Sequence, residues 1–169
     1  RASGRWRDDE RIVVFTEYKT TLDYLVRRLG ARYPAERILA LFGGGGTDGM
    51  DQVERDRVKG AFNSPAHSVR MLVATDAAAE GLNLQSTARY LLHFDCPWNP
   101  SRLEQRNGRI DRTLQPAPVV RCHYFAYPER TEDAVLETLV QKVEVIRKEL
   151  GSLGSVLMER LDDVLARGI

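Results

Sequence analysis

The stretch "RIVVFTEYKTTLDYLVRRLG", residues 11–30, sets the class of the fold. Its first part is a short run of β-branched and aromatic residues, which predicts a strand over 11–16. Its second part predicts a helix over 18–30, because Leu22, Leu25, Val26 and Leu29 fall on one face and Gly30 closes the pattern. A strand followed directly by such a helix is typical of a parallel sheet, in which a helix connects neighbouring strands.

The same alternation continues along the chain. A helix is predicted over 50–64, with Val53, Arg57 or Val58, Ala61 and Phe62 at helical spacing. Four further short apolar runs predict strands: "ILALF" (38–42), "VRMLVAT" (69–75), "YLLHFD" (90–95) and "VVRCHYF" (119–125). We therefore expect an α/β fold in which a five-stranded parallel sheet is flanked by helices.

The pattern changes after Pro128. Thr131 is a plausible N-cap, and the helical stripe over 131–150 is typical of a packing surface. We expect a lead-in or linker over 1–10, an α/β lobe over 11–127 and a helical extension over 128–169. Because the sequence does not begin with methionine, we expect it to be a piece of a longer protein.

Composition excludes several classes of function. The 169 residues are 43% apolar, which suits one ordinary domain, and the formal net charge is only +1, so any contact with a polyanion must be local. Cys96 and Cys122 are far apart and lack a zinc spacing, so both are interpreted as buried small hydrophobic residues, and no metal site is expected. No apolar run approaches the roughly 18 residues of a membrane span, and we expect a cytoplasmic protein without membrane contact.

Two loops that follow strands carry candidate binding residues. In "FTEY" (15–18), Thr16 can cap the next helix or offer its hydroxyl to a phosphate, and capping is the favoured interpretation. In "VATDAAAEGLNLQ" (73–85), Asp76 can accept from a sugar hydroxyl, and Thr75 and Asn83 can donate to phosphates. The alternative for Asp76 is an ordinary helix N-cap.

The segment "LEQRNGRIDR", residues 103–112, places Arg106, Arg109 and Arg112 at three-residue spacing. If the whole segment is helical, this spacing gives a solvated basic face. Ser101 could cap that helix, and Gly108 inside it would cost roughly 1 kcal/mol relative to alanine. Such a glycine suggests that backbone or a ligand approaches closely, which favours a functional site.

These three segments, in this order, resemble motifs IV, V and VI of the second RecA-like lobe of superfamily 2 helicases and translocases, and motif VI has the pattern Q-x-x-G-R-x-x-R. "FDCPWNPSRLEQRNGRIDRTLQ" (94–115) resembles the Swi/Snf-type double-stranded DNA translocases, and most of all their bacterial RapA-like branch, with relatives in antiphage systems such as DISARM. The resemblance covers about residues 11–125. It departs where family members have isoleucine-glycine-glutamine and this chain has Thr113, Leu114 and Gln115.

The resemblance implies a role for each candidate residue. Arg109 and Arg112 would be arginine fingers that reach the γ-phosphate of ATP held by a partner lobe. The implied ATP-binding residues are Gln105, Asp76, Gly108 and Gly81, where Asp76 meets the ribose or the motif VI helix. The implied nucleic-acid contacts are Thr16, Gly43, Thr75 and Asn83.

The resemblance also implies ATP with Mg²⁺ as the cofactor, bound mainly by a first lobe. The glycine-rich loop "LFGGGGTDGM" (41–50) lacks the lysine and hydroxyl residue of a P-loop, so a mobile loop is its plainer interpretation. With no P-loop and no Asp-Glu motif, the chain alone is not expected to hydrolyse ATP.

The implied partners are the N-terminal RecA-like lobe of the same parent chain and the backbone of double-stranded DNA, with RNA polymerase or defence-system proteins as further candidates. Within this class, a strand-separating helicase and an RNA-dependent ATPase are the nearest alternatives. From another class, the chain could be a non-catalytic α/β binding module that uses the helix over 131–150 as its partner surface.

Overall fold

The computed structural model describes residues 8–43, 49–79, 82–97, 99–125 and 127, and four single positions, Thr138, Val140, Gln141 and Val145. The chain forms two compact units, the first from residues 1–95 and 106–124 and the second from 96–105 and 125–169. The sheet belongs to the first unit. Thr131 and most of the helix predicted over 131–150 lie outside the described residues.

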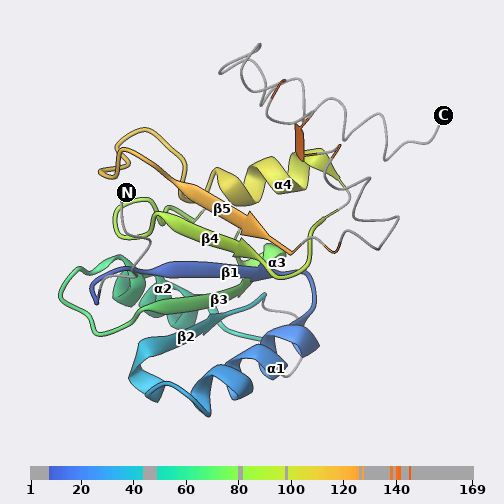
Figure 1. The fold of residues 1–169 in the computed structure, drawn as a ribbon. Helices are drawn as coiled ribbons and strands as arrows, with labels where there is room; N and C mark the ends of the chain where they lie inside the picture. The colour runs from blue at the N-terminus through green and yellow to red at the C-terminus, as the bar shows by residue number, and fades with distance from the viewer. Residues whose placement is uncertain are drawn as a thin grey trace. The chain divides into compact units, whose positions relative to one another are not determined.

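Five strands form one sheet in the order β2-β3-β1-β4-β5. Every neighbouring pair is parallel, so all five strands end at the same edge, as the arrowheads in Figure 1 show. The predicted five-stranded α/β layer is confirmed. The strands are β1 (Ile12–Thr16), β2 (Ile38–Leu41), β3 (Met71–Thr75), β4 (Tyr90–His93) and β5 (Arg121–Tyr124).

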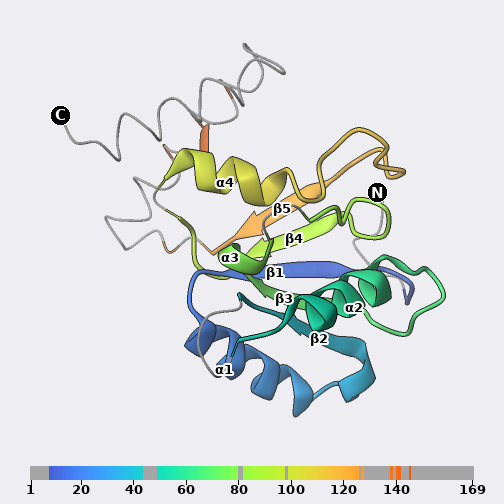
Figure 2. The same cartoon turned by 180° about the vertical axis from the view of Figure 1, so that it is seen from behind.

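Helices cover both faces of this sheet. Figures 1 and 2 show α1 (Lys19–Gly30) on one face and α2 (Gln52–Asn63) with the short α3 (Asp76–Ala79) on the other. A 3₁₀ turn, η1 (Ala35–Arg37), leads into β2. The remaining helix, α4 (Pro100–Asn107), begins in the second unit and ends in the first.

Alternation along the strands sends side chains to two separate cores. On the α2 face, the fully buried Phe15 and Phe62 belong to the larger cluster. On the α1 face, Val14 and Val73 pack with Leu22, and the predicted stripe of α1 is confirmed because its other members pack there too. A sheet buried on both faces explains why its strands are nearly continuous apolar runs.

The predicted helix over 50–64 is confirmed in type, but one of its predicted inward positions is wrong. Val53 is 77% exposed, whereas Val58 and Phe62 pack in the core. Asp51 caps α2, because its Oδ1 accepts a hydrogen bond of 2.7 Å from the backbone N–H of Glu54. The cap fixes where the helix starts, and Val53, in its first turn, faces solvent.

Candidate functional site

Strand ends bring the first candidate residues together. Thr16, the last residue of β1, is the register partner of Thr75, the last residue of β3. Asp76 follows β3 directly, and Asp95 follows β4 by two residues. Because parallel strands end at one edge, residues from three separate stretches of sequence meet there, which is where open α/β sheets bind ligands.

Asp95 joins the ends of β1 and β4. Its carboxylate accepts a hydrogen bond from the Thr16 hydroxyl and bonds of 2.9 and 3.0 Å from the backbone N–H of Glu17. Thr16 is fully buried. The favoured interpretation of Thr16 as a helix cap is therefore wrong: the N-cap position of α1 is Tyr18, which makes no side-chain cap bond. In this arrangement the Thr16 hydroxyl is already bound to a carboxylate.

Arg106 is the centre of the site. Its Nε lies 2.6 Å from Oδ1 of Asp76 and its Nη2 lies 2.8 Å from Oδ2, a bidentate pair. The same guanidinium reaches Asp95, with Nη2 3.2 Å from Oδ1 and Nη1 2.6 Å from the backbone oxygen. The Cζ atom of Arg106 lies 5.7 Å from the centre of the Phe15 ring. One buried arginine thus connects two loops at the sheet edge.

The burial of Arg106 contradicts the interpretation of residues 103–112 as a solvated basic face. Only 2% of its side chain is exposed, so the spacing of three does not place three arginines on one open surface. Burial alone would lower the pKa of Arg106, but hydrogen bonds and charges from Asp76 and Asp95 raise it above its ordinary value. Arg106 was missing from the predicted site. The sequence signal that could have indicated its role is the pair of acids, Asp76 and Asp95, each of which closely follows a strand.

Asp76 was interpreted as a contact for a sugar hydroxyl or as a helix N-cap, and the structure pairs its carboxylate with an arginine. Asp76 is the first residue of α3, and its carboxylate is bound to Arg106 at the end of the motif VI helix. The resemblance implied a contact with this helix or with the ribose of a nucleotide. Both oxygens of Asp76 take part in the pair.

His93 lies beside this network and is only 1% exposed. Its Nε2 is 2.9 Å from Oδ1 of Asn107. An amide oxygen only accepts, so with this assignment of the amide Nε2 carries the proton and donates. Within the described part of the chain, Nδ1 is buried without a hydrogen-bond partner. Burial lowers the pKa of His93 from 6.5 to about 4, so the ring is neutral at pH 7.

The helix that carries Arg106 stops earlier than its arginine spacing predicts. α4 ends at Asn107, and the next residues form a turn in which the N–H of Arg109 donates to Arg106 O (3.0 Å) and that of Asp111 to Asn107 O (2.9 Å). The prediction that Gly108 lies inside the helix is therefore wrong. A glycine just past a helix end is common, and the argument from helix propensity does not apply to it.

A buried anchor holds this turn. Ile110 is fully buried between Arg109 and Arg112 in the sequence, in the core of the α2 face. The backbone oxygen of Arg109 accepts from the N–H of Leu84 (3.0 Å), and Nε2 of Gln115 donates to the backbone oxygen of Ile110 (2.7 Å). The turn is thus fixed against the segment that follows α3 and against the loop beyond it.

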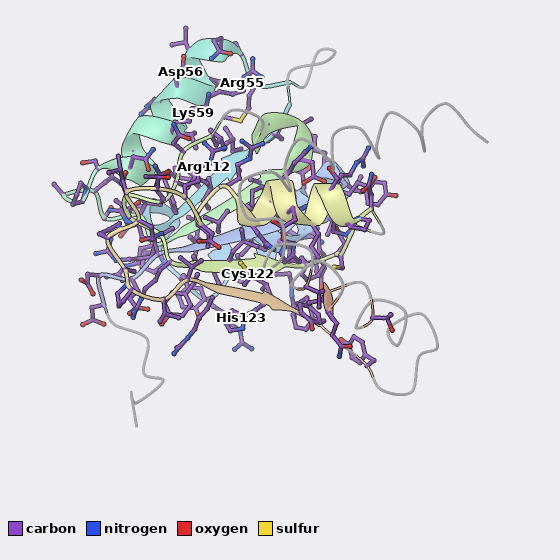
Figure 3. All side chains as sticks on the ribbon, turned by 90° about the horizontal axis from the view of Figure 1, so that it is seen from above. Arg55, Asp56, Lys59, Arg112, Cys122 and His123 are labelled. Carbon is purple, nitrogen blue, oxygen red and sulfur yellow. The ribbon has the colours of Figure 1, made fainter. Side chains whose placement is uncertain are left out.

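Arg109 and Arg112 differ in environment. Arg109 is half-buried, whereas Arg112 is exposed and donates from Nη1 to Oδ1 of Asn83. The backbone oxygen of Asn83 accepts from Nδ2 of Asn63, at the end of α2 (2.9 Å). Figure 3 labels Arg112 near α2. The structure therefore connects Asn83, in the segment after α3, with Arg112, in the turn after α4.

The other predicted site residues lie at separate places in the fold. Thr75 is buried at the end of β3. Gly43, after β2, approaches α3 so closely that a Cβ there would lie 3.2 Å from Cβ of Ala77. Gly81 lies outside the described residues, and Gln105 is an exposed residue of α4 in the second unit.

At the start of α4, the predicted cap is wrong by two residues. Oδ1 of Asn99 accepts from the backbone N–H of Ser101 (2.9 Å), so Asn99 acts as the cap. Both cysteines are half-buried, and neither is in a disulfide bond. Within the described ranges, no three histidine, cysteine or acidic side chains are grouped to hold a metal ion, and no helix there has the length and apolar character to cross a membrane.

Comparison with known proteins identifies the family. The chain is 32% identical over 168 residues to "Uncharacterized ATP-dependent helicase YqhH" of Bacillus subtilis (93% of this chain, 28% of that protein). It is 37% identical over 89 residues to "RNA polymerase-associated protein RapA" of Erwinia tasmaniensis (53% of this chain, 9% of that protein). The chain thus spans under a third of the length of these curated relatives.

A solved structure supports the fold. "Crystal structure of the C-terminal part of Fun30 ATPase domain" matches with a TM-score of 0.61 and 20% identity, over 76% of this chain and 38% of that one. At this identity the likeness shows the fold alone, which is the predicted RecA-like sheet flanked by helices. Residues 5–113 match the family described as "Helicase conserved C-terminal domain". The chain therefore belongs to the helicase C-terminal domain family.

Proposed function

We propose that this chain is the second motor lobe of an ATP-dependent, Swi/Snf-type translocase on double-stranded DNA. In this proposal Arg109 and Arg112 are arginine fingers for ATP with Mg²⁺ held by the N-terminal RecA-like lobe of the same parent chain. Gln105, Asp76, Gly81 and Gly108 would line the nucleotide side. Thr16, Gly43, Thr75 and Asn83 would lie along the DNA backbone.

The observation that carries the proposal is the fixed turn after α4. Ile110 is buried, and backbone bonds hold its neighbours, so Arg109 and Arg112 extend from a rigid segment instead of a loose loop. Preorganised cations act on developing charge at little reorganisation cost. In phosphoryl transfer, an arginine finger contributes about 10³ to 10⁵ in rate.

The contacts of Arg106 and Arg112 also support a coupling between ATP binding and DNA contact. Arg106 binds Asp76, and Arg112 binds Asn83, so motif VI is bonded twice to the motif V segment. If ATP held by the N-terminal lobe attracts Arg112, the hydrogen bond between Arg112 and Asn83 competes with that movement. Nucleotide state would then alter how Asn83 faces the DNA backbone.

Thr16 has a restricted part in this proposal. Because its hydroxyl donates to Asp95 and its side chain is fully buried, contact with a phosphate would require that bond to break. Thr75 is also buried. We therefore assign most of the DNA contact in this lobe to Gly43 and Asn83. The relative named for its association with RNA polymerase makes polymerase one candidate partner, and proteins of antiphage defence are another.

The test is the ATPase rate of the full-length parent protein with double-stranded DNA, single-stranded DNA, RNA or no polymer. We expect stimulation chiefly by duplex DNA, and a loss of about 10³-fold in Arg109→Ala and in Arg112→Ala. Arg57→Ala is the matched control, because Arg57 is an exposed arginine on α2. Full activity in both finger variants would mean that Arg109 and Arg112 are not arginine fingers. No stimulation by any polymer would instead favour a non-catalytic binding module. Stimulation by RNA alone would move the chain to the RNA-dependent class.

A further inference from the structure

Arginines without a charged partner are concentrated at one place in the described chain. Between residues 24 and 37 there are four arginines and one acid, Glu36. We call Arg27, Arg28, Arg32 and Arg37 the α1 arginine cluster; all four are exposed. Arg27 lies over the Tyr24 ring at 5.9 Å, and within the described residues no hydrogen bond or ion pair engages any of the four guanidinium groups.

This is unlike most other arginines of the part of the chain that the structure describes. Several have side-chain hydrogen bonds to a backbone oxygen, an amide or an acid: Arg11, Arg55, Arg70, Arg89, Arg106 and Arg112. Since the chain's net charge is only +1, the cluster is a local excess of positive charge, not a sample of a basic surface. Arg57 and Arg121 are exposed arginines outside it, and they lie far apart in the sequence.

Local structure explains part of the cluster. Arg27 and Arg28 lie in the last turn of α1, where positive charge interacts favourably with the helix dipole. Arg32 and Arg37 lie beyond the helix, in the turn after it and at the end of η1, so the dipole does not account for them. The N–H groups of Arg32 and Tyr33 both donate to the backbone oxygen of Leu29 (2.9 Å each), which turns this stretch back beside the helix end.

The composition favours nucleic acid as the partner. Tyr24 and Tyr33 are each about half exposed among the arginines, and no exposed large aliphatic side chain of the described chain lies between residues 24 and 37. Four arginines with one acid and no exposed large aliphatic side chain resemble the positively charged, polar interfaces that bind nucleic acid more than they resemble protein interfaces. Guanidinium groups bind phosphate oxygens with fixed geometry, and tyrosine hydroxyls add hydrogen bonds to phosphate and sugar.

The cluster is separate from the site described above. α1 starts at the edge where the strands end and runs back to the edge where β2 begins, so its last turn lies at the opposite edge from Thr16, Gly43 and Asp76, as Figure 1 shows. It is also on the other face of the sheet from α2 and α3, which Figure 2 shows from behind.

We propose that the α1 arginine cluster, with Tyr24 and Tyr33, is a second nucleic-acid contact that binds the phosphate backbone outside the motor site. This contact needs neither ATP nor the arginine fingers. It would hold the polymer while the motor contacts are exchanged. Because it binds the backbone, it adds affinity without sequence preference.

The test is binding of a fluorescein-labelled 30-base-pair duplex to the 169-residue chain without nucleotide, by anisotropy at several salt concentrations. We expect Arg28→Gln/Arg32→Gln to weaken binding about 10-fold near 0.1 M salt and to reduce the slope of log K against log salt by about 2, close to 0.9 for each lost phosphate contact. The matched control is Arg57→Gln/Arg121→Gln, which removes two exposed arginines elsewhere and should change affinity less than 2-fold.

Additional variants and controls separate an effect on charge from an effect on folding. Arg28→Lys/Arg32→Lys keeps the charge and should bind within about 3-fold of the unsubstituted chain. Circular dichroism at 222 nm must be unchanged in each variant. Equal losses in the test and control pairs, no duplex binding at low salt, or equal competition by poly-glutamate would each overturn the proposal. Loss of ATPase in Arg109→Ala with unchanged duplex binding would leave it standing, so the two proposals fail separately.

Discussion

Arg106 and Asp76 form a bidentate pair, with Nε and Nη2 of the arginine 2.6 and 2.8 Å from the two carboxylate oxygens. The same guanidinium also binds Asp95, whose carboxylate accepts from Thr16 and from the backbone of Glu17. Three strand ends and α4 therefore share one charged network. Removing one member leaves the others charged and without their partner in a largely buried place.

We expect Arg106→Gln to lower the free energy of unfolding by about 3 to 5 kcal/mol, because Asp76 and Asp95 then lose a buried counter-ion. Arg106→Lys should be nearly as costly, since an ammonium group cannot make the bidentate pair. Urea denaturation followed by circular dichroism measures both. The control is Lys19→Gln, which breaks the exposed pair with Asp23 and should cost less than about 0.5 kcal/mol. A loss for Arg106→Gln no larger than the control's would contradict the network.

Leu114 has an unusual backbone, with φ of 71° and a side chain that is 87% exposed. The left-handed region disfavours a residue with a Cβ, whereas glycine adopts it freely. We expect Leu114→Gly to raise the melting temperature, with a gain of about 0.5 to 1 kcal/mol after the greater chain entropy of glycine is subtracted. Leu114→Ala, which keeps the Cβ, should change stability little. Destabilisation by glycine would show that Leu114 makes contacts that outweigh its strain.

Gly43 and Gly60 should respond in opposite directions to alanine. A Cβ at Gly43 would lie 3.2 Å from Cβ of Ala77, whereas at Gly60, inside α2, nothing lies within 4 Å. We expect Gly43→Ala to cost about 1 kcal/mol and Gly60→Ala to stabilise by about 1 kcal/mol, because alanine is the better helix former. Thermal melts compare the two. Adding Ala77→Gly should recover part of the Gly43→Ala loss, and a failure to do so would mean the crowding is relieved elsewhere.

The fold could be predicted from the sequence because its signals are local. Each strand is a short apolar run, and the α1 stripe of Leu22 and its neighbours specifies one face. The α4 boundary could not be predicted the same way. The three-residue spacing continues from Arg106 through Arg109 to Arg112, but the chain leaves the helix at Asn107 and turns through Gly108. Periodicity of residue type does not show where backbone hydrogen bonds stop.

The candidate site was predictable in its members more than in their contacts. Asp76, Asn83, Arg109 and Arg112 were recognised by a resemblance to known motifs. Arg106 was missed. Whether Arg106 or Arg112 is buried depends on pairing with residues 11 to 30 positions away, as the bonds to Asp76, Asn83 and Asp95 show. Thr16 was assigned to a helix cap because the competing acceptor, Asp95, lies 79 positions away. A hydrogen-bond acceptor so distant in the sequence cannot be identified from the residues next to Thr16.

His93 gives a prediction about pH. Burial lowers the pKa of its ring to about 4, while the unfolded chain keeps a value near 6.5. Between these two values the unfolded state binds a proton that the folded state does not, so stability rises with pH in this window. Conversely, lowering the pH from 7 to 5 should remove about 2 kcal/mol of unfolding free energy through this residue.

The measurement is urea denaturation of the unsubstituted chain and of His93→Gln at pH 5, 6 and 7. Glutamine can still donate to Asn107 but does not titrate, so this variant should lose about 2 kcal/mol less than the unsubstituted chain between pH 7 and pH 5. His123→Gln, an exposed substitution on β5 (Figure 3), is the control and should keep the pH slope. Equal slopes for His93→Gln and the unsubstituted chain would mean that the buried ring accepts its proton without loss of the fold, and the unpartnered Nδ1 would be the atom that receives it.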